Sequence, residues 1–489
     1  MALDSWLIKV KTALSNGFES VRSVPPNNSN NGKPLIKKTN VGVLAFEIAG
    51  LMSKLIHLWK SLSDKNILLL KTQAISLEGV RKIVSNDDSF LLTLACAEMV
   101  DNLSLLSRSA SRFSSRCVDP SLRNFHDLLN QFADTGFDTH NWLLSGKEFD
   151  SILKKIDRLI SSTANLHKQI DTLTTLETGL KKMFKDQNEI TVKQQRIIDL
   201  KQRIIWQRQE IKILKDKSLW NRTYDSVNSL IVRFIFTILA RIKHVFGVVH
   251  HGRLIPVSLS RTLSASATVY PSENQETCNF VSGPLNMDDD NKYLDHDDGD
   301  GDGDHRPGFF EMNSKTMIPP SGTLGAAALS HHYANLIIVM EKMIKSPQLV
   351  GMDARDDLYY MLPSSIRSAL RIRLKGVGFS ASDPGLAGEW RDALGKILGW
   401  VSPLAHNMIK WQSERSFEQQ QHLIPKTNFL LFQTLFFANK VKTEAAITEL
   451  LVGLNYIWRF EREMINAKAF IQGANFNGFS NPNTTISNQ

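Results

Sequence analysis

The sequence has few cysteines and lacks a long uninterrupted apolar run. Its three cysteines, Cys96, Cys117 and Cys278, lie far apart in the 489-residue chain and have no paired spacing. This spacing argues against a disulfide framework or a zinc site, and it fits a reducing compartment. The first residues alternate apolar and charged side chains, which is not the pattern of a secretory signal. The strongest membrane-span candidate, residues 230–239, is about half the length of a span and contains Arg233, so we expect no transmembrane span.

The sequence also lacks any pattern typical of an active site. It contains neither GxSxG nor HExxH, and its paired histidines lack the spacing and carboxylate support of a zinc helix. The Asp-rich residues 297–305 resemble the start of a calcium loop, but Phe309 stands where the bidentate Glu is needed. The GxGxxA match at residues 376–381 precedes Asp-Pro-Gly instead of a phosphate-binding helix. We therefore predict a protein that is not an enzyme, with no catalytic residue, no cofactor and no metal.

The net charge of +9 conceals a strong asymmetry. Residues 286–305 contain nine Asp and one Lys, so this segment carries −8 and the remainder of the chain carries +17. The strongly basic remainder of the chain favours anionic partners such as nucleic acid, acidic lipid or acidic protein surfaces. The alternative is an ordinary solvated surface with a tethered acidic segment.

The basic charge is concentrated in residues 181–247, which hold 15 Lys/Arg against 6 Asp/Glu and no Pro. Several apolar residues recur there at helical spacing: Ile190, Ile197, Leu200, Ile204, Ile211 and Leu214. We predict a long basic helical spine over residues 147–247, partly a coiled coil, and one continuous helix from Lys181 to Gly247. Glu177 breaks the preceding seam, which favours packing in a bundle. The basic side chains lack a recognised nucleic-acid-binding module around them, which disfavours direct nucleic-acid binding.

The N-terminal residues 1–22 predict an amphipathic helix. Its apolar face comprises Leu3, Trp6, Leu7, Val10, Leu14 and Phe18. Such a face either docks on the rest of the protein or contacts an anionic membrane surface. Two further candidate sites are a nuclear-import cluster of Lys33, Lys37 and Lys38 and a phosphorylation site at Ser264, three residues after Arg261.

The pattern of apolar, capping and breaking residues predicts an all-α protein with two helical domains. The predicted segments are the N-terminal helix (1–22), a linker (23–40), an N-terminal helical domain with the spine (41–251), a disordered acidic and Ser-rich linker (252–321), a C-terminal helical domain (322–473) and a disordered tail (474–489). The predicted N-caps are Asp64, Asp87 and Asp119, with Pro120 in a first turn, and Ser321 or Thr323 in the second domain. Helix breaks or kinks are expected at Pro363 and Pro403.

Three stretches resemble one plant family. They are VGVLAFEIAGLMSKLIHLWKSLSD with its continuation to LACAEMVDNL, SLWNRTYDSV with FTILARIKHVFG, and GTLGAAALSHHYANLIIVMEKM with DDLYYMLPSSIRSALRIRLK. In this order they resemble the PSK simulator-type proteins, with two paired domains of unknown function. The resemblance implies a nuclear, non-enzymatic positive regulator of growth connected with phytosulfokine signalling. Founding members carry an N-terminal myristoylation signal, whereas position 2 here is Ala2, so we expect that anchor to be absent.

We therefore predict a non-enzymatic positive regulator of plant growth in phytosulfokine signalling that acts as a helical scaffold with protein partners. The alternative is a membrane-peripheral adaptor in trafficking or defence signalling. The predicted location is the nucleus, the cytoplasmic periphery of the plasma membrane, or both.

Overall fold

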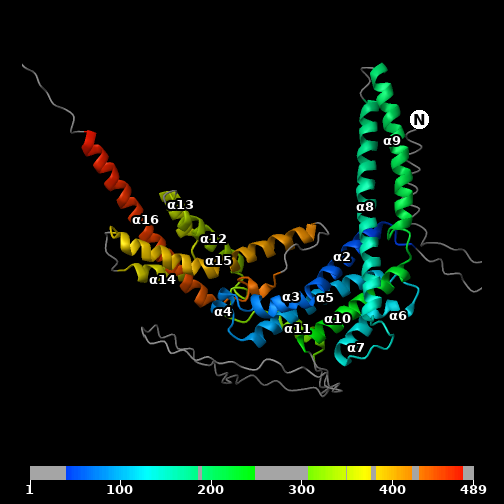
Figure 1. The fold of residues 1–489 in the computed structure, drawn as a ribbon, viewed down its shortest axis with the longest axis horizontal. Helices are drawn as coiled ribbons and strands as arrows, with labels where there is room; N and C mark the ends of the chain where they lie inside the picture. The colour runs from blue at the N-terminus through cyan, green and yellow to red at the C-terminus, as the bar shows by residue number, and fades with distance from the viewer. Residues whose placement is uncertain are drawn as a thin grey trace, which may run out of the picture. The chain divides into compact units, whose positions relative to one another are not determined.

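The computed structural model describes residues 40–185, 190–247, 307–347, 350–375, 381–420 and 429–476. Within these ranges every regular element is a helix, and the β-bridges Asn40–Thr223 and Thr323–Asn439 are isolated. The all-α prediction is therefore confirmed. Buried apolar side chains form two cores, one mainly in residues 40–247 and one mainly in residues 322–476. The helices of these stretches are labelled in Figure 1. We call these stretches the first and second helical regions.

The first helical region combines short helices with four helices of more than twenty residues. Its elements are η1 (Gly42–Leu44), α2 (Ala45–Ser61), α3 (Asp64–Leu69), η2 (Leu70–Ala74), α4 (Glu78–Ile83), α5 (Asp88–Ser114), α6 (Pro120–Arg123), α7 (Phe125–Thr135), α8 (Gly146–Lys185), α9 (Ile190–Lys217) and α10 (Tyr224–Phe246). α10 packs along α5 and supplies fully buried side chains such as Ile231, Phe234 and Ile238. Burial of each such side chain contributes roughly 1.5–3 kcal/mol before the entropy cost of ordering the chain.

The predicted helix starts in this region are largely confirmed. The side chains of Asp87 and Asp119 each accept a hydrogen bond from the backbone N–H two residues later, at 2.8 and 2.9 Å. Pro120 occupies the first turn of α6, where its missing N–H costs no helical hydrogen bond. The prediction for Asp64 is wrong by one residue, because Asp64 is already the first residue of α3. Its carboxylate instead pairs with Arg241 of α10.

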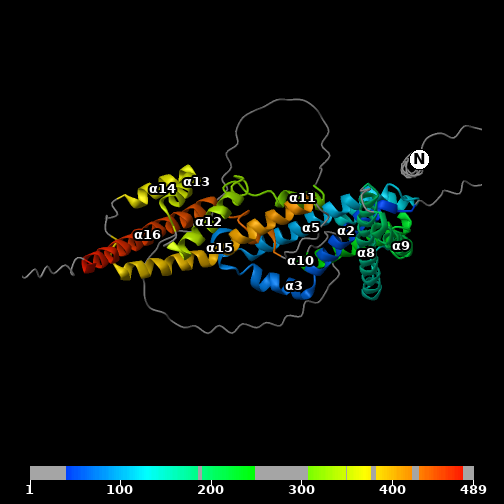
Figure 2. The same ribbon diagram turned by 90° about the horizontal axis from the view of Figure 1, so that it is seen from above.

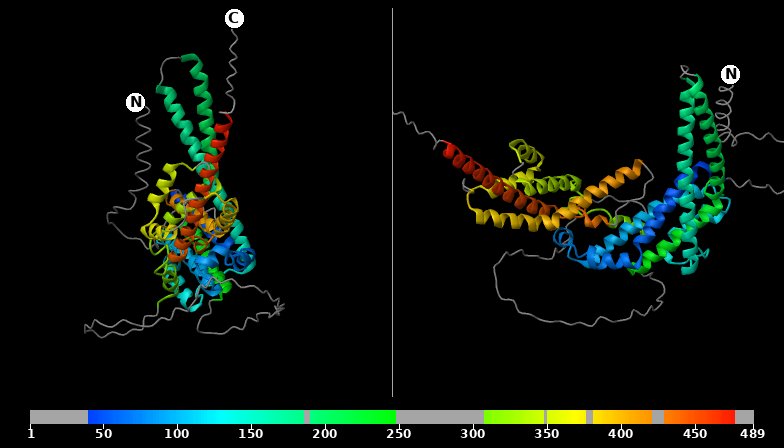
Figure 3. Two further views of the ribbon diagram at one scale, coloured as in Figure 1. Left: turned by 90° about the vertical axis from the view of Figure 1, so that its left-hand side faces the viewer. Right: turned by 45° about the horizontal axis from the view of Figure 1, so that its top comes forward.

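The basic spine is divided into three helices. α8 and α9 run antiparallel and side by side as a hairpin, and α10 follows after a break at residues 218–223 (Figures 1 and 3). The prediction of one continuous helix from Lys181 to Gly247 is therefore wrong. At the break Leu219 is fully buried in the first core, and the Thr223 hydroxyl caps α10 by accepting a hydrogen bond from Ser226 N at 3.3 Å. Burial and capping compensate for the interrupted helical hydrogen bonds.

Residues 307–321 belong to the described structure, although the sequence places them in the disordered linker. They include α11 (Phe309–Thr316), which packs on α5 and α7. The Phe309 backbone N–H donates to Asp134 Oδ1 at 2.7 Å, and Phe309 and Phe310 both pack against the first core. Two aromatic side chains supply the apolar area that ordering requires. The linker prediction is thus wrong at its end, while residues 252–306 lie outside the described residues.

Lys243 of α10 is buried at the junction of α7, α10 and α11, with 6% of its surface exposed. Its ammonium group donates to the backbone carbonyls of Phe132 and Ala133, near the end of α7. It also lies 4.6 Å from the centroid of the Phe309 ring. Burial lowers the pKa of Lys243 to about 8, although the nearby Asp134 carboxylate opposes this shift.

This pKa predicts a specific pH dependence of stability. Because the unfolded state keeps an ordinary lysine pKa of 10.5, it binds more protons than the folded state between about pH 8 and 10.5. The free energy of unfolding of the wild type, relative to a Lys243→Met variant, should therefore rise by about 1–3 kcal/mol over this range. Urea unfolding of both proteins from pH 7 to 10.5 measures the difference. A constant difference would contradict the burial of a charged Lys243.

The second helical region is built from long helices that pack against each other (Figure 2). Its elements are α12 (Ser330–Lys345), α13 (Met352–Met361), α14 (Ser364–Leu374), α15 (Pro384–Gln420), η4 (Leu431–Gln433) and α16 (Lys440–Phe476). Pro363 separates α13 from α14 as predicted, and Pro403 lies inside α15. The tail after residue 476 lies outside the described residues.

The first helix of this region starts later than predicted. Ser321 and Thr323 precede α12 by several residues, so the prediction that either caps it is wrong. Residues 321–329 instead form turns, in which the backbone N–H groups of Leu324 and Gly325 donate to carbonyls of residues 438 and 436. These contacts hold the segment against the residues just before α16, and they use backbone donors that would otherwise be free to form a helix.

Contacts join the two helical regions. The backbone N–H of Asn439 donates to the carbonyl of Ile83 at 2.7 Å, and the N–H of Leu431 donates to Glu98 Oε2 at 2.6 Å. Leu431 and Phe432, although they belong to the second region by sequence, are buried in the first core. The segment between α15 and α16 therefore ties the second region to α4 and α5.

Two helical stretches, 42–61 and 88–114, are long and apolar enough to cross a membrane by length and composition. Both are core helices in the structure, and 44% and 50% of their most apolar windows are buried inside the protein. Helices of a soluble core meet the same criterion, so this is weak evidence for a span. The stretch singled out in the sequence, residues 230–239, lies within the buried helix α10.

Candidate interaction surface on the α8–α9 hairpin

The sequence-predicted site residues fall outside the part of the chain that the structure describes. These residues are Leu3, Trp6, Leu7, Val10, Leu14, Phe18, Lys33, Lys37, Lys38 and Ser264. The amphipathic helix, the nuclear-import cluster and the phosphorylation site therefore stay predictions.

The described residues hold no group of three or more His, Cys, Asp or Glu side chains that could bind a metal ion. Cys96 and Cys117 are buried free thiols. Burial raises the pKa of each thiol to about 11, which disfavours the reactive thiolate at neutral pH. These two side chains are best explained as core residues.

The α8–α9 hairpin offers a surface of a different kind. One face of α9 packs on α8, with Ile204 and Ile211 buried and Ile197, Leu200 and Leu214 half-buried. These five residues belong to the apolar face predicted from the sequence, which is confirmed to this extent. At the base of the hairpin the fully buried Thr163 hydroxyl accepts a hydrogen bond from Leu219 N at 3.2 Å.

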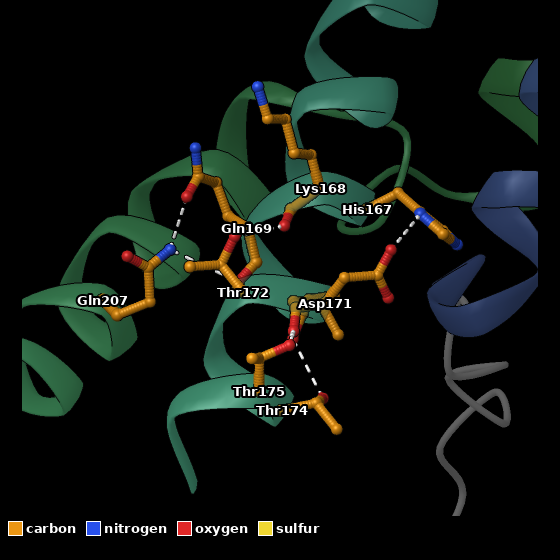
Figure 4. Close-up of polar contacts among 9 residues, drawn as sticks. His167, Lys168, Gln169, Asp171, Thr172, Thr174, Thr175 and Gln207 are labelled. Carbon is orange, nitrogen blue, oxygen red and sulfur yellow. Dashed lines mark hydrogen bonds and ion pairs between the residues drawn. The ribbon is translucent and has the colours of Figure 1, made fainter. Parts of the chain in front are cut away.

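Polar contacts fix the register of the two helices. The Gln207 side-chain amide of α9 donates to Gln169 Oε1 of α8 at 2.5 Å (Figure 4), and Arg208 pairs with Glu177 at 2.7 Å. Along α8 the hydroxyls of Thr172, Thr174 and Thr175 donate to carbonyls four residues earlier, which satisfies them within their own helix. These contacts set which side chains of α9 face α8 and which point outward.

The opposite face of α9 is a second apolar surface, which we call the outer face. Ile198 and Ile205 are each 56% exposed, Trp206 is 69% exposed and Ile213 is 49% exposed. At 100° per residue these four side chains cluster on the side of the helix away from Ile204 and Ile211. The isoleucines recur at intervals of seven and eight residues, a signal present in the sequence that the single-face prediction missed.

Neutral and basic side chains complete the outer face. Gln195, Gln202 and Gln209, spaced by seven residues, lie between the apolar side chains along its centre. Lys201, Arg208 and Lys212 follow one edge, at spacings of seven and four residues. α9 as a whole has eight Lys/Arg against three Asp/Glu. Apolar anchors, amide groups and a basic edge together form a surface that suits an acidic macromolecular partner.

Two family models match parts of the chain. Residues 43–99 match a domain of unknown function, DUF3475, which here covers α2 to the first half of α5. Residues 323–410 match a protein of unknown function, DUF668, which covers α12 to most of α15. The α8–α9 hairpin lies between the two matched ranges.

Three curated plant proteins from Arabidopsis thaliana are similar to this chain. Protein PSK SIMULATOR 1 is 26% identical over 91% of this chain and 58% of its own length. Protein PSK SIMULATOR 3 is 25% identical over 86% and 56%, and Protein PSK SIMULATOR 2 is 24% identical over 96% and 68%. The chain thus spans less than three fifths of the first two relatives. No solved structure matches it.

Proposed function

Because the chain is similar to PSK simulator-type plant proteins over most of its length and carries both domains of that type, we propose that it is a non-enzymatic positive regulator of plant growth in phytosulfokine-related signalling. It acts as a helical scaffold in the nucleus or at the cytoplasmic periphery of the plasma membrane. The observation that carries the scaffold role is the outer face of α9, where an exposed Trp206 lies among exposed isoleucines of the hairpin.

The proposed occupant of the outer face is an amphipathic helix of a partner protein with acidic residues along one edge. Ile198 and Ile213 are fifteen residues apart, which corresponds to about 22 Å along the helix axis. A partner helix can pack along such a stripe and can satisfy the amides of the central glutamines. An acidic edge would complement Lys201 and Lys212.

Two other occupants fit the outer face less well. A membrane would bury the amides of Gln202 and Gln209 in hydrocarbon, where lipid offers them no hydrogen-bond partner, which is costly. A second copy of α9 packed antiparallel would place basic edge against basic edge. An acidic helix avoids both penalties.

The experiment uses plants in which the gene for this chain is disrupted. Reintroduced wild-type protein should restore growth and its response to phytosulfokine, whereas an Ile205→Asp/Trp206→Ala variant should not. Loss of the aromatic anchor and burial of an Asp should weaken partner binding about tenfold or more. A matched control is Val441→Asp, which changes a side chain that is 72% exposed at the start of α16. This control should behave as the wild type.

The outcomes separate the two parts of the proposal. Failure of the wild type to restore growth would contradict the growth role. Full rescue by the α9 variant would leave the growth role standing and remove the outer face as its surface. Proximity labelling is carried out with the wild type, the α9 variant and the Val441→Asp control. The partner is the protein that is labelled by the wild type and the control but not by the α9 variant. A label confined to membrane proteins, unchanged in that variant, would favour the membrane-peripheral adaptor instead.

A further inference from the structure

A pocket of about 210 Å³ lies between α13, α14 and α16 in the second helical region. Its apolar wall consists of Leu358, Leu362, Leu370, Leu451 and Leu454, all of which are buried. The polar part of its lining comprises Arg355, Asp356, Tyr359, Asn455 and Trp458. A mainly apolar pocket with a few polar groups on one side is the usual form of a small-molecule site.

The guanidinium of Arg355 is held in place by an aromatic ring. Its central carbon lies 3.7 Å from the centroid of Trp458, and the Trp458 indole N–H donates to the carbonyl of Val350 at 3.1 Å. The indole is therefore fixed at both its face and its edge. Stacking of this kind orients the flat guanidinium and leaves its N–H groups directed outward in the ring plane.

Arg355 lacks an acidic partner at contact distance. Among the described residues its side chain contacts the Met352 sulfur at 3.8 Å and the Trp458 ring, and no carboxylate oxygen forms an ion pair with it within 4.0 Å. Burial lowers the pKa of Arg355, with nearby Asp356 opposing and Arg462 assisting this shift. A partly desolvated cation without an acidic partner favours an anion beside it.

Two further cations surround this side of the pocket. Arg462 lies 5.4 Å from the same Trp458 ring, and Arg371 donates to the hydroxyl of the lining residue Tyr359 at 3.0 Å. Asp356 is the one acidic side chain in the lining, and it is exposed. Arg371 and Arg462 therefore add positive charge beside the one cation and the one anion of the lining.

We propose that this pocket binds a small organic carboxylate with an apolar body. The guanidinium of Arg355 takes the carboxylate as a bidentate partner, and the apolar body lies against Leu358, Leu370 and Leu454. A volume of about 210 Å³ equals the liquid volume of roughly seven water molecules, which suits an acid of about ten non-hydrogen atoms. This site is independent of the outer face of α9 and of the growth role.

Octanoate is the probe, tested by isothermal titration calorimetry with the full chain. We expect one saturable site with a Kd of about 0.1–1 mM, as suits a ligand of this size. Octylamine and methyl octanoate, which keep the chain but not the negative charge, should bind about tenfold more weakly or not at all. Equal binding of octylamine, or no octanoate binding up to about 10 mM, would overturn the proposal.

Variants locate the site on the protein. Arg355→Gln should weaken octanoate binding about tenfold or more, and Arg355→Lys should also weaken it because an ammonium group does not form the stacked fork. Lys396→Gln is the matched control, since Lys396 is an exposed cation on α15 outside the pocket. Circular dichroism and Tm establish that each variant is folded. Wild-type affinity in a folded Arg355→Gln variant would rule out this pocket as the site.

Discussion

Replacing Gly79 with alanine is expected to destabilise the protein by about 2 kcal/mol. A Cβ atom at this position would lie 2.2 Å from the backbone carbonyl oxygen of Trp400 and 2.6 Å from Leu404 Cδ1. A backbone carbonyl of α15 cannot rotate away as a flexible side chain can, so α4 must move away from α15. The loss of packing outweighs the roughly 1 kcal/mol that alanine gains over glycine in helix propensity.

Gly179→Ala provides the matched control for this substitution. Gly179 lies inside α8, and a Cβ atom there meets no other atom within 4 Å. This variant should be more stable than the wild type by roughly 0.5–1 kcal/mol, because alanine is the better helix former. Urea unfolding followed by circular dichroism compares the three proteins. Equal stability changes of the same sign at both positions would show that α4 does not pack this tightly on α15.

The contact at Gly79 illustrates what the sequence does not reveal. Gly79 stands in an ordinary apolar-periodic stretch, and glycine there looks like a weakness of the helix. Glycine is required at this position because the backbone of Trp400, more than three hundred residues later in the chain, lies too close for a Cβ atom. Similarly, no local pattern indicates that Leu431 and Phe432 contribute to the first core. Such long-range contacts depend on how the two regions meet.

Local signals were predictable because their physics is local. Asp87 and Asp119 cap their helices through their own backbone neighbours, and Pro363 separates α13 and α14 by removing a donor. The break between α9 and α10 is different, since the residues around it could also continue a helix. Burial of Leu219 against the first core decides it.

The candidate surface on α9 was only half predictable. The face of Ile204 and Ile211 emerged from the helical spacing, and the structure buries it against α8. The outer face of Ile198, Ile205 and Ile213 follows the same period on the opposite side, so one sequence cannot say which face is buried. The position of α8 determines which face of α9 is buried, because α8 covers only one side of α9. The pocket at Arg355 could not be predicted at all, because its walls come from three separate helices.

Replacing Glu341 with glutamine should destabilise the second helical region by about 2–3 kcal/mol. The carboxylate on α12 accepts hydrogen bonds from Lys345 Nζ at 2.7 Å, from Ser402 Oγ at 2.6 Å and from His406 Nε2 at 2.8 Å. Ser402 and His406 flank Pro403 on α15, so this carboxylate joins α12 to α15 where a helical donor is missing. Glutamine keeps the shape but loses the charge that strengthens all three bonds.

The pH dependence of this difference identifies its cause. Burial alone would raise the pKa of Glu341, but the hydrogen bonds from Lys345, Ser402 and His406 outweigh it and lower the pKa to about 2. The unfolded state has an ordinary pKa of 4.5, so the stabilising contribution is complete above this pH and is lost as the pH falls towards 2. The stability difference between the wild type and Glu341→Gln should therefore shrink over this range.

The control is an exposed ion pair on α11, in which Glu311 contacts Lys315. Glu311→Gln should change the free energy of unfolding by less than about 0.5 kcal/mol at neutral pH, because surface ion pairs contribute little. A difference at Glu341 that persists undiminished at pH 2 would mean that shape, and not charge, holds α12 to α15.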